Sequence, residues 1–185
     1  RQPFDERRNI DMPDASPVIN ASTVSLSYNK IEKFPSELFT AGSPITSIDL
    51  SGNQMRTIPK GSIKGKNAYL LQVIDLRFNK LTSLSDDFRS TTLPYITNMD
   101  VSYNCFSEVP TQPLNSANLR AFAINHQRDA NDNRCLRTWP TGITSCPSLI
   151  QFQIGSNDIR KVEEKLTYHL YIVNIKDNPN ISIDV

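Results

Sequence analysis

Three aspartates, Asp49, Asp75 and Asp100, recur along the chain at nearly constant intervals, each between two apolar residues. Carboxylates gathered in this way can bind a cation or a basic partner, and an opposed pair can hydrolyse a glycosidic bond. On neighbouring strands they would repel one another by about 1 kcal/mol per pair even when solvated, and that crowding alone gives a fold nothing. Arg77 is placed to neutralise part of the charge. These positions are therefore candidates for contact with a partner.

A catalytic centre does not fit these residues. The two histidines, His126 and His169, belong to no pattern of nucleophile, base and orienting group. Aspartates that share one open wall also lack the opposed wall and the apolar pocket that glycoside chemistry uses. No CxxC spacing offers a structural zinc site. We therefore expect no enzyme, no cofactor and no metal.

The segments that carry the aspartates repeat. In Ile48-Asp49-Leu50 and Met99-Asp100-Val101 the alternation favours a short strand with its apolar residues pointing inward. A polar residue follows each strand at a fixed offset: Asn29, Asn53, Asn79, Asn104, Asn157 and Asn178, with Gln127 at the equivalent place in the fifth unit. The asparagines are 24, 26, 25, 53 (two units) and 21 residues apart. These intervals lie within or near the roughly 20 to 29 residues of one class of solenoid repeat.

The repeated asparagine has a structural explanation. It falls where the chain turns away from the strand, and its amide can satisfy backbone groups that the turn leaves without partners. We expect this column to hold the turns and to take no part in catalysis. On the return path, turn signals precede apolar anchors, and Ser36 and Ser85 are placed as helix N-caps. The segment 59–63 has the same character, so all three predict short helical or 3₁₀ turns.

The repeat resembles the leucine-rich repeat family over nearly the whole chain. The resemblance implies an α/β solenoid, a right-handed horseshoe-like superhelix with a concave parallel β-sheet and short helical or 3₁₀ turns on the convex side. The proline after several units is similar to the short bacterial type of repeat. The family also implies a concave sheet that binds a partner, and it favours a bacterial secreted or surface-attached protein.

Composition agrees with one elongated domain. The chain has 185 residues, 38% of them hydrophobic, and a net charge of +1, which provides no field for nucleic acid. No run of about 18 apolar residues predicts a membrane span. We expect residues 1–17 to be a linker or the tail of a preceding domain. Residues 18–185 would form about seven repeats whose C-terminal cap is missing, within a larger protein.

The fifth unit carries an insertion of seven residues within the polar stretch 126–134. It predicts a loop at the edge of the sheet, either a recognition loop or a tolerated bulge. Asp129, Asn131 and Asn133 alternate like calcium ligands, but the turn glycine and the bidentate glutamate are missing. Cys105 and Cys135 occupy equivalent positions on adjacent repeats, close enough for a disulfide. Three free thiols are the alternative.

Two outward columns of the predicted sheet are candidates for partner binding. One column holds aromatic rings after each strand, which either form a contact surface or pack sideways on each other. The other holds the aspartates. The candidate residues are Tyr28, Asp49, Asp75, Arg77, Phe78, Asp100, Tyr103, His126 and Gln153.

Together these features predict a non-catalytic recognition module at the bacterial cell surface or outside the cell. Its concave sheet would bind a protein or a glycan. A structural spacer that supports a neighbouring domain is the alternative.

Overall fold

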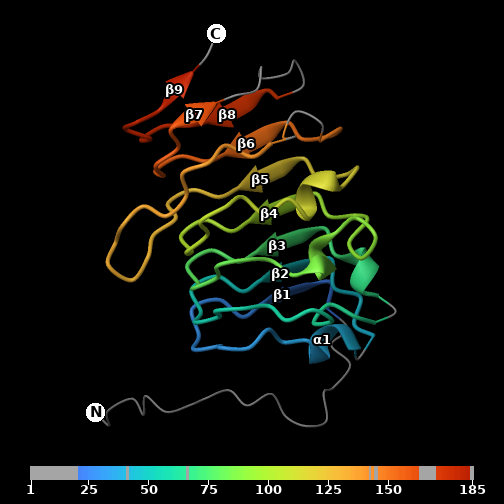
Figure 1. Ribbon diagram of the computed structural model, residues 1–185. Coiled ribbons are helices and arrows are strands. Elements are labelled where there is room, and N and C mark those ends of the chain that lie inside the picture. The colour runs from blue at the N-terminus through green and yellow to red at the C-terminus, as the bar shows by residue number, and fades with distance from the viewer. Residues whose placement is uncertain are drawn as a thin grey trace, which may run out of the picture.

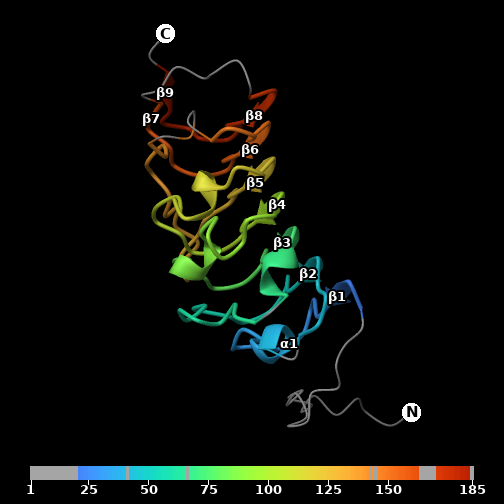
Figure 2. The same cartoon turned by 90° about the vertical axis from the view of Figure 1, so that its right-hand side faces the viewer.

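The computed structural model describes residues 21–40, 42–65, 67–141, 143, 146–162 and 170–183. These residues coil into a solenoid, and one strand of each coil joins a seven-stranded parallel sheet on one side (Figures 1 and 2). The predicted α/β solenoid of the leucine-rich repeat type is confirmed. The N-terminal residues 1–17 and His169 lie outside the described residues.

The sheet strands are only three residues long, and they follow one another in chain order. They are β1 (Thr23–Ser25), β2 (Ser47–Asp49), β3 (Val73–Asp75), β4 (Asn98–Asp100), β5 (Ala121–Ala123), β6 (Gln151–Gln153) and β8 (Ile172–Asn174). The register places Asp49, Asp75 and Asp100 side by side on β2, β3 and β4. The aspartate column predicted from the repeat is therefore real.

The return path carries short helical turns in part as expected. They are α1 (Glu37–Thr40), η1 (Ala68–Leu70), η2 (Asp86–Phe88) and η3 (Pro113–Asn115). The segment 59–63 has a turn and no helix, which corrects the prediction there, because Gly61 has a φ of +84° outside the helical region. Ser85 stands at the N-cap of η2 but makes no capping hydrogen bond with its side chain. A second sheet pairs β7 (Lys161–Val162) with β9 (Ser182–Ile183), and this pairing was not predicted from the repeat pattern.

The core runs the length of the solenoid between the sheet and the return path. Ile48, Ile74 and Met99 at the strand centres are at most 3% exposed, and the apolar residue that follows each strand from β2 to β6, such as Leu76, is fully buried. On β5 and β6 the corresponding core residues are aromatic, and the ring centroids of Phe122 and Phe152 lie 6.1 Å apart. Each repeat thus buries its apolar side against its neighbours, as the short strands require.

The asparagine column ties successive repeats together. The Nδ2 of Asn79 donates to the carbonyl of Leu76 in its own repeat and to that of Leu50 in the preceding one, and its Oδ1 accepts from the amide of Met55. Asn53, Asn104, Asn157 and Asn178 repeat this arrangement. Gln127 does the same with its longer side chain, accepting from Phe106 and donating to Val101. The predicted structural role of this column is confirmed.

Candidate functional site

One position in every repeat has a left-handed backbone. It lies directly before the column asparagine, and we call its seven residues the edge column: Tyr28, Gly52, Phe78, Tyr103, His126, Ser156 and Asp177. Their φ angles fall between 54° and 67°. Such angles cost a residue other than glycine about 1 to 2 kcal/mol, so every repeat except the one with Gly52 must offset this strain with other contacts. The edge column is therefore a place where side-chain interactions stabilise the turn.

In the middle of the edge column, aromatic rings supply those contacts. Phe78 and Tyr103 stack with ring centroids 4.2 Å apart, and Tyr103 and His126 stack at 4.6 Å. Burial lowers the pKa of His126, and the nearby Arg128 lowers it further, so the imidazole is neutral near pH 7. Phe78 and Tyr103 remain 41% and 42% exposed. The rings thus both pack sideways and present their edges to solvent.

Tyr28 stands apart from that stack. Its ring lies against Gly52, where a Cβ would come within 2.6 Å of the ring, and its side chain is 77% exposed. The glycine in the second repeat thus makes room for the tyrosine of the first. The Tyr28 ring thus covers the place of Gly52, the edge-column residue that has no side chain.

After His126 the edge column contains no aromatic rings, and side chains of the insertion make the contacts there instead. Residues 128–134 form a small hairpin, joined by an antiparallel bridge between Arg128 and Arg134, which protrudes at one edge in Figure 1. The Arg128 guanidinium donates to the carbonyl of Ser156 at 2.8 Å. Arg134 donates to the carbonyls of Asn157 and Asp177 and pairs with the Asp177 carboxylate at 2.9 Å. The insertion therefore fastens the last repeats and is not a free bulge.

Within the hairpin, Asp129 is used as a turn acceptor. Its carboxylate accepts hydrogen bonds from the amides of Asn131 and Asn133 and from the Asn133 side chain. Those bonds, with the Asn133 side chain first, hold the pKa of Asp129 below its ordinary value. The alternation that resembles a calcium loop is thus explained by the turn. Over the residues that the structure describes, no three histidine, cysteine, aspartate or glutamate side chains gather as a metal site would require.

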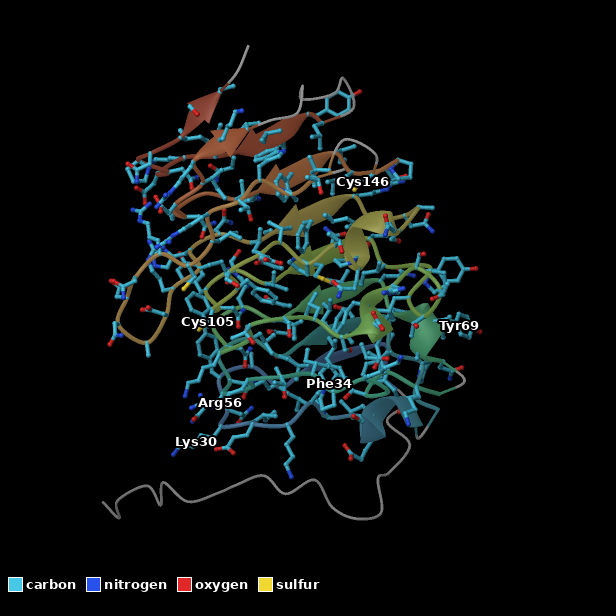
Figure 3. The ribbon with its side chains drawn as sticks, viewed as in Figure 1. Lys30, Phe34, Arg56, Tyr69, Cys105 and Cys146 are labelled. Atoms are coloured by element: carbon cyan, nitrogen blue, oxygen red, sulfur yellow. The ribbon has the colours of Figure 1, made fainter. Side chains whose placement is uncertain are left out.

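Cys105 and Cys135 are not bonded to each other, so the disulfide that the register allowed between them is not formed. The hairpin turns the Cys135 sulfur toward the carbonyl of Asn133, at 3.4 Å. Burial raises the pKa of both thiols, which keeps them protonated at neutral pH. Cys105 lies on the same edge of the solenoid as Lys30 and Arg56, whereas Tyr69 lies on the other (Figure 3).

The aspartates have a structural role that the repeat pattern did not reveal. Asp49 accepts a hydrogen bond from the amide of Ser51, and Asp100 accepts one from the amide of Ser102, each two residues further along the chain. Asp75 accepts the equivalent bond from Arg77 and also binds its guanidinium, with Nη2 at 2.6 Å. The crowding of like charges is thus partly offset by bonds that end each strand. The crowding of charges itself still gives the fold nothing, but each carboxylate accepts a hydrogen bond from a backbone amide at the end of its strand.

The carboxylates at the two ends of this column differ in their surroundings. Burial would raise the pKa of Asp49, but hydrogen bonds from Ser51, Ser27 and Ser25 outweigh it and lower the pKa. Burial raises the pKa of Asp100, the neighbouring Asp75 charge adds to the rise, and the bonds from Ser102 offset it only in part. Arg77 is 3.7 Å from Asp100, against 2.6 Å from Asp75. Asp100 is the less well stabilised anion.

Next to Asp100 the exposed face of the sheet is hollowed. Both outward residues of β5 are alanines, Ala121 and Ala123, while β3 and β4 carry larger side chains on one flank and β6 carries Gln151 and Gln153 on the other. The hollow, which we call the trough, has a volume of about 330 Å³. It is lined by Val73, Ile74, Asp75, Arg77, Asn98, Met99, Asp100, Ala121, Phe122, Ala123, Gln151 and Gln153.

The candidates from the sequence therefore fall into separate groups. Asp75, Arg77, Asp100 and Gln153 meet at the trough. Phe78, Tyr103 and His126 form the ring stack, and Tyr28 and Asp49 belong to neither group. The floor of the trough was not predicted from the sequence, although the two alanines around Phe122 are a visible signal, since most outward strand positions carry larger residues.

No helix in the described parts of the chain has the length and apolar character needed to cross a membrane.

Comparisons with known proteins agree with the geometry. No protein-family model matches the sequence. A leucine-rich repeat protein of Bacteroides thetaiotaomicron VPI-5482 is 73% identical over 90% of this chain, with a TM-score of 0.88. Another, from Bacteroides eggerthii DSM 20697, is 61% identical over 96% of this chain, with a TM-score of 0.91. Mouse Tsukushi is 30% identical over 81 residues, 44% of this chain.

These relatives are longer than the chain. It spans 20% and 30% of the two Bacteroides proteins and 23% of Tsukushi. The strand register and the asparagine column of this chain, together with the similarity in sequence, all indicate the same type of repeat. The chain is similar in sequence and in fold to leucine-rich repeat proteins, and its described residues form a leucine-rich repeat solenoid.

Proposed function

We propose that this chain is a non-catalytic recognition module that binds a protein partner on the concave face of its sheet. The trough is the observation that carries the proposal. It combines a small-residue floor with Asp75, Arg77, Asp100 and Gln153 on its sides, and its volume lies at the lower end of the roughly 300 to 1,000 Å³ of ligand clefts. A hollow that has a small number of polar groups at fixed positions is suited to receive a side chain of a partner.

The ring stack lies along one edge of the same face and extends the contact area. Half-exposed aromatic side chains offer large apolar area with little loss of entropy on binding, and they are frequent at contact hot spots. Stacking at 4.2 and 4.6 Å covers both faces of the Tyr103 ring and one face each of Phe78 and His126, which leaves little aromatic face open in the stack. A sugar ring stacks on an aromatic face, so this arrangement favours a protein partner over a glycan.

The relatives support a partner of this kind and a location outside the bacterial cell. The Toll–Spätzle complex of Drosophila contains a chain with this fold, with a TM-score of 0.71 at 20% identity, so the fold occurs in a protein that assembles with another protein. The two Bacteroides relatives favour a bacterial origin, and a surface-attached or secreted protein is our proposal for the whole. The present chain would be the repeat segment of that larger protein.

The trough can be tested by filling it. Ala121→Trp places a large side chain over β5 without removing any polar contact, and Asn115→Trp adds the same ring at an exposed position on η3. Chemical cross-linking on cells that produce the full protein, followed by mass spectrometry, identifies partners of the wild type. We expect Ala121→Trp to lose at least one of them and Asn115→Trp to keep them all.

The ring stack is tested by replacing Tyr28, Phe78 and Tyr103 together with serine, which this chain itself carries in the edge column at Ser156. The loss of stacking should lower the melting temperature, so loss of a partner by a variant that is still folded at the assay temperature supports recognition by the rings. Retention of every partner by both the trough variant and the ring variant would overturn the proposal and leave a spacer.

A further inference from the structure

We propose that the trough receives the cationic side chain of an arginine or lysine from the partner, with the Asp100 carboxylate as its ion-pair acceptor. This inference rests on the proposed recognition function and specifies the chemistry of the partner. It is carried by the charge of the trough, by the unequal pairing of its carboxylates and by the shape of its floor.

The charge of the trough is negative. Its lining contains two carboxylates, Asp75 and Asp100, and a single cation, Arg77, while the remaining residues are apolar or carry neutral amides. Asp49 stands beside Asp75 on the adjacent strand and adds a further negative charge nearby. A basic side chain is the complement of this surface, and an acidic one would be repelled.

The single cation, Arg77, already forms an ion pair with Asp75. Both Nε and Nη2 of Arg77 donate to Asp75, at distances between 2.6 and 3.0 Å, whereas Nε lies 3.7 Å from Asp100. The Asp49 carboxylate accepts hydrogen bonds from the hydroxyl and the amide of Ser51 and from the hydroxyl of Ser25. Asp100 has the amide of Ser102 and the longer contact to Arg77. Its raised pKa agrees with this weaker stabilisation. Among the three aspartates, Asp100 therefore gains most from a cation brought by a partner.

The floor of the trough suits the stem of such a side chain. Ala121 and Ala123 leave an apolar strip directly beside Asp100, because β4 and β5 are paired with Asp100 opposite Ala123. Lysine and arginine have long apolar stems that pack on such surfaces while the charged head reaches a polar group. The amides of Asn98 and Gln153 stand at the sides of the trough, where they can contact the head or the backbone of the partner.

The test uses a defined probe. The ¹⁵N-labelled chain is titrated with N-acetyl-arginine amide and N-acetyl-lysine amide, and with N-acetyl-citrulline amide as a neutral analogue of nearly the same shape. We expect either cation to shift the backbone resonances of Ala121, Ala123 and Gln153, and citrulline to shift them little. Equal shifts with citrulline, or cation-induced shifts confined to other surfaces, would overturn the inference.

Variants assign the effect to one carboxylate. Asp100→Asn keeps an oxygen that can accept from Ser102, so the fold should persist, and we expect cation binding to weaken about fivefold or more. Asp49→Asn, one strand further from the trough than Asp75, should weaken it less. Asp86→Asn on η2 changes the net charge equally on the convex side and should leave binding unchanged. A uniform effect of all three variants would show attraction by overall charge and contradict a defined site.

Failure of this inference can be told apart from failure of the proposed function. If Ala121→Trp loses a cellular partner while no cation binds the wild type, the recognition module stands and the basic side chain is wrong. If the cations bind but no partner depends on the trough, the proposed function falls instead.

Discussion

The two halves of the edge column solve the same backbone problem with different chemistry. From Phe78 to His126, stacked rings cover residues with left-handed φ angles. At Ser156 and Asp177 the same angles are accompanied by guanidinium groups that reach over from the hairpin. The difference shows that the repeat fixes the backbone at this position, while the side chains that compensate for the strain are free to vary. A function can therefore be placed on the edge column without changing the fold.

The largest effect is expected where strain and stacking coincide. Tyr103→Val removes contacts with two rings, worth about 0.5 to 1.5 kcal/mol each, and places a β-branched residue at a φ of 57°. We expect the free energy of unfolding to fall by about 3 kcal/mol, measured by urea denaturation monitored by circular dichroism.

Two controls separate the contributions. Tyr103→Gly also loses the ring but relieves the backbone, so it should cost clearly less than valine. Ser156→Val increases the backbone strain in the half without rings, because a β-branched residue tolerates a positive φ less well than serine, and it should cost about 1 kcal/mol. If Ser156→Val destabilised the chain as much as Tyr103→Val, the rings would contribute nothing and the comparison would fail.

The hairpin half is tested by removing its main contact. Arg134→Met leaves the carbonyls of Asn157 and Asp177 without their charged donor, and we expect a loss of about 1 to 2 kcal/mol. Hydrogen exchange should quicken at the amides of the last two repeats and remain unchanged at Leu76. Arg137→Met is the matched control, because that side chain is 58% exposed and makes only a 3.5 Å contact with Asp158. It should cost less than about 0.5 kcal/mol. Equal protection of the last repeats in both variants would show that the hairpin does not fasten them.

A smaller effect is expected at the gap between Tyr28 and the ring stack. Gly52→Ala places a Cβ within 2.6 Å of the Tyr28 ring at a φ of +67°, but the ring is largely exposed and can move. The cost is then mainly that of the backbone, about 1 kcal/mol. Gly42→Ala has a similar φ of +78° and open space around its Cβ. A melting temperature for Gly52→Ala well below that of Gly42→Ala would show that the ring position itself is stabilising.

The fold was predictable from the sequence because its determinants recur. Asn53, Asn79 and Asn104 each bond to two successive repeats, so one local pattern reports both the turn and the stacking. Even Gln127 could be identified, since its side chain carries the same amide as asparagine and is only one methylene longer. The pairing of Lys161 with Ser182 could not be predicted, because it occurs only once and has no repeat to reveal it.

The candidate site was predictable only in part. Alternation places Asp75 and Asp100 on one face, but it does not show that Arg77 is bound by one of them more than the other. The trough depends on small side chains at Ala121 and Ala123, and an alanine draws attention only when the sizes of its neighbours on the sheet are known. The role of Arg134 was hidden as well, because it acts on a repeat 43 residues further along the chain.

Acid should produce the smallest effect, and it should act on the two regions with opposite sign. The hydrogen bond from Arg134 holds the pKa of Asp177 below its ordinary value of 3.8, so its contribution is present above that value and is lost as the pH falls through the lower folded pKa. The pKa of Asp100 is raised, so its charge costs stability at neutral pH, and that cost disappears on acidification. Nuclear magnetic resonance should therefore show the signals at β4 changing first as the pH falls, when Asp100 takes up its proton, and the hairpin loosening from the last repeats only at a lower pH, below 3.8. In Arg134→Met the Asp177 titration should move toward 3.8, because the guanidinium that stabilised the carboxylate is gone, and an unchanged titration would mean that the hairpin does not hold Asp177 in solution.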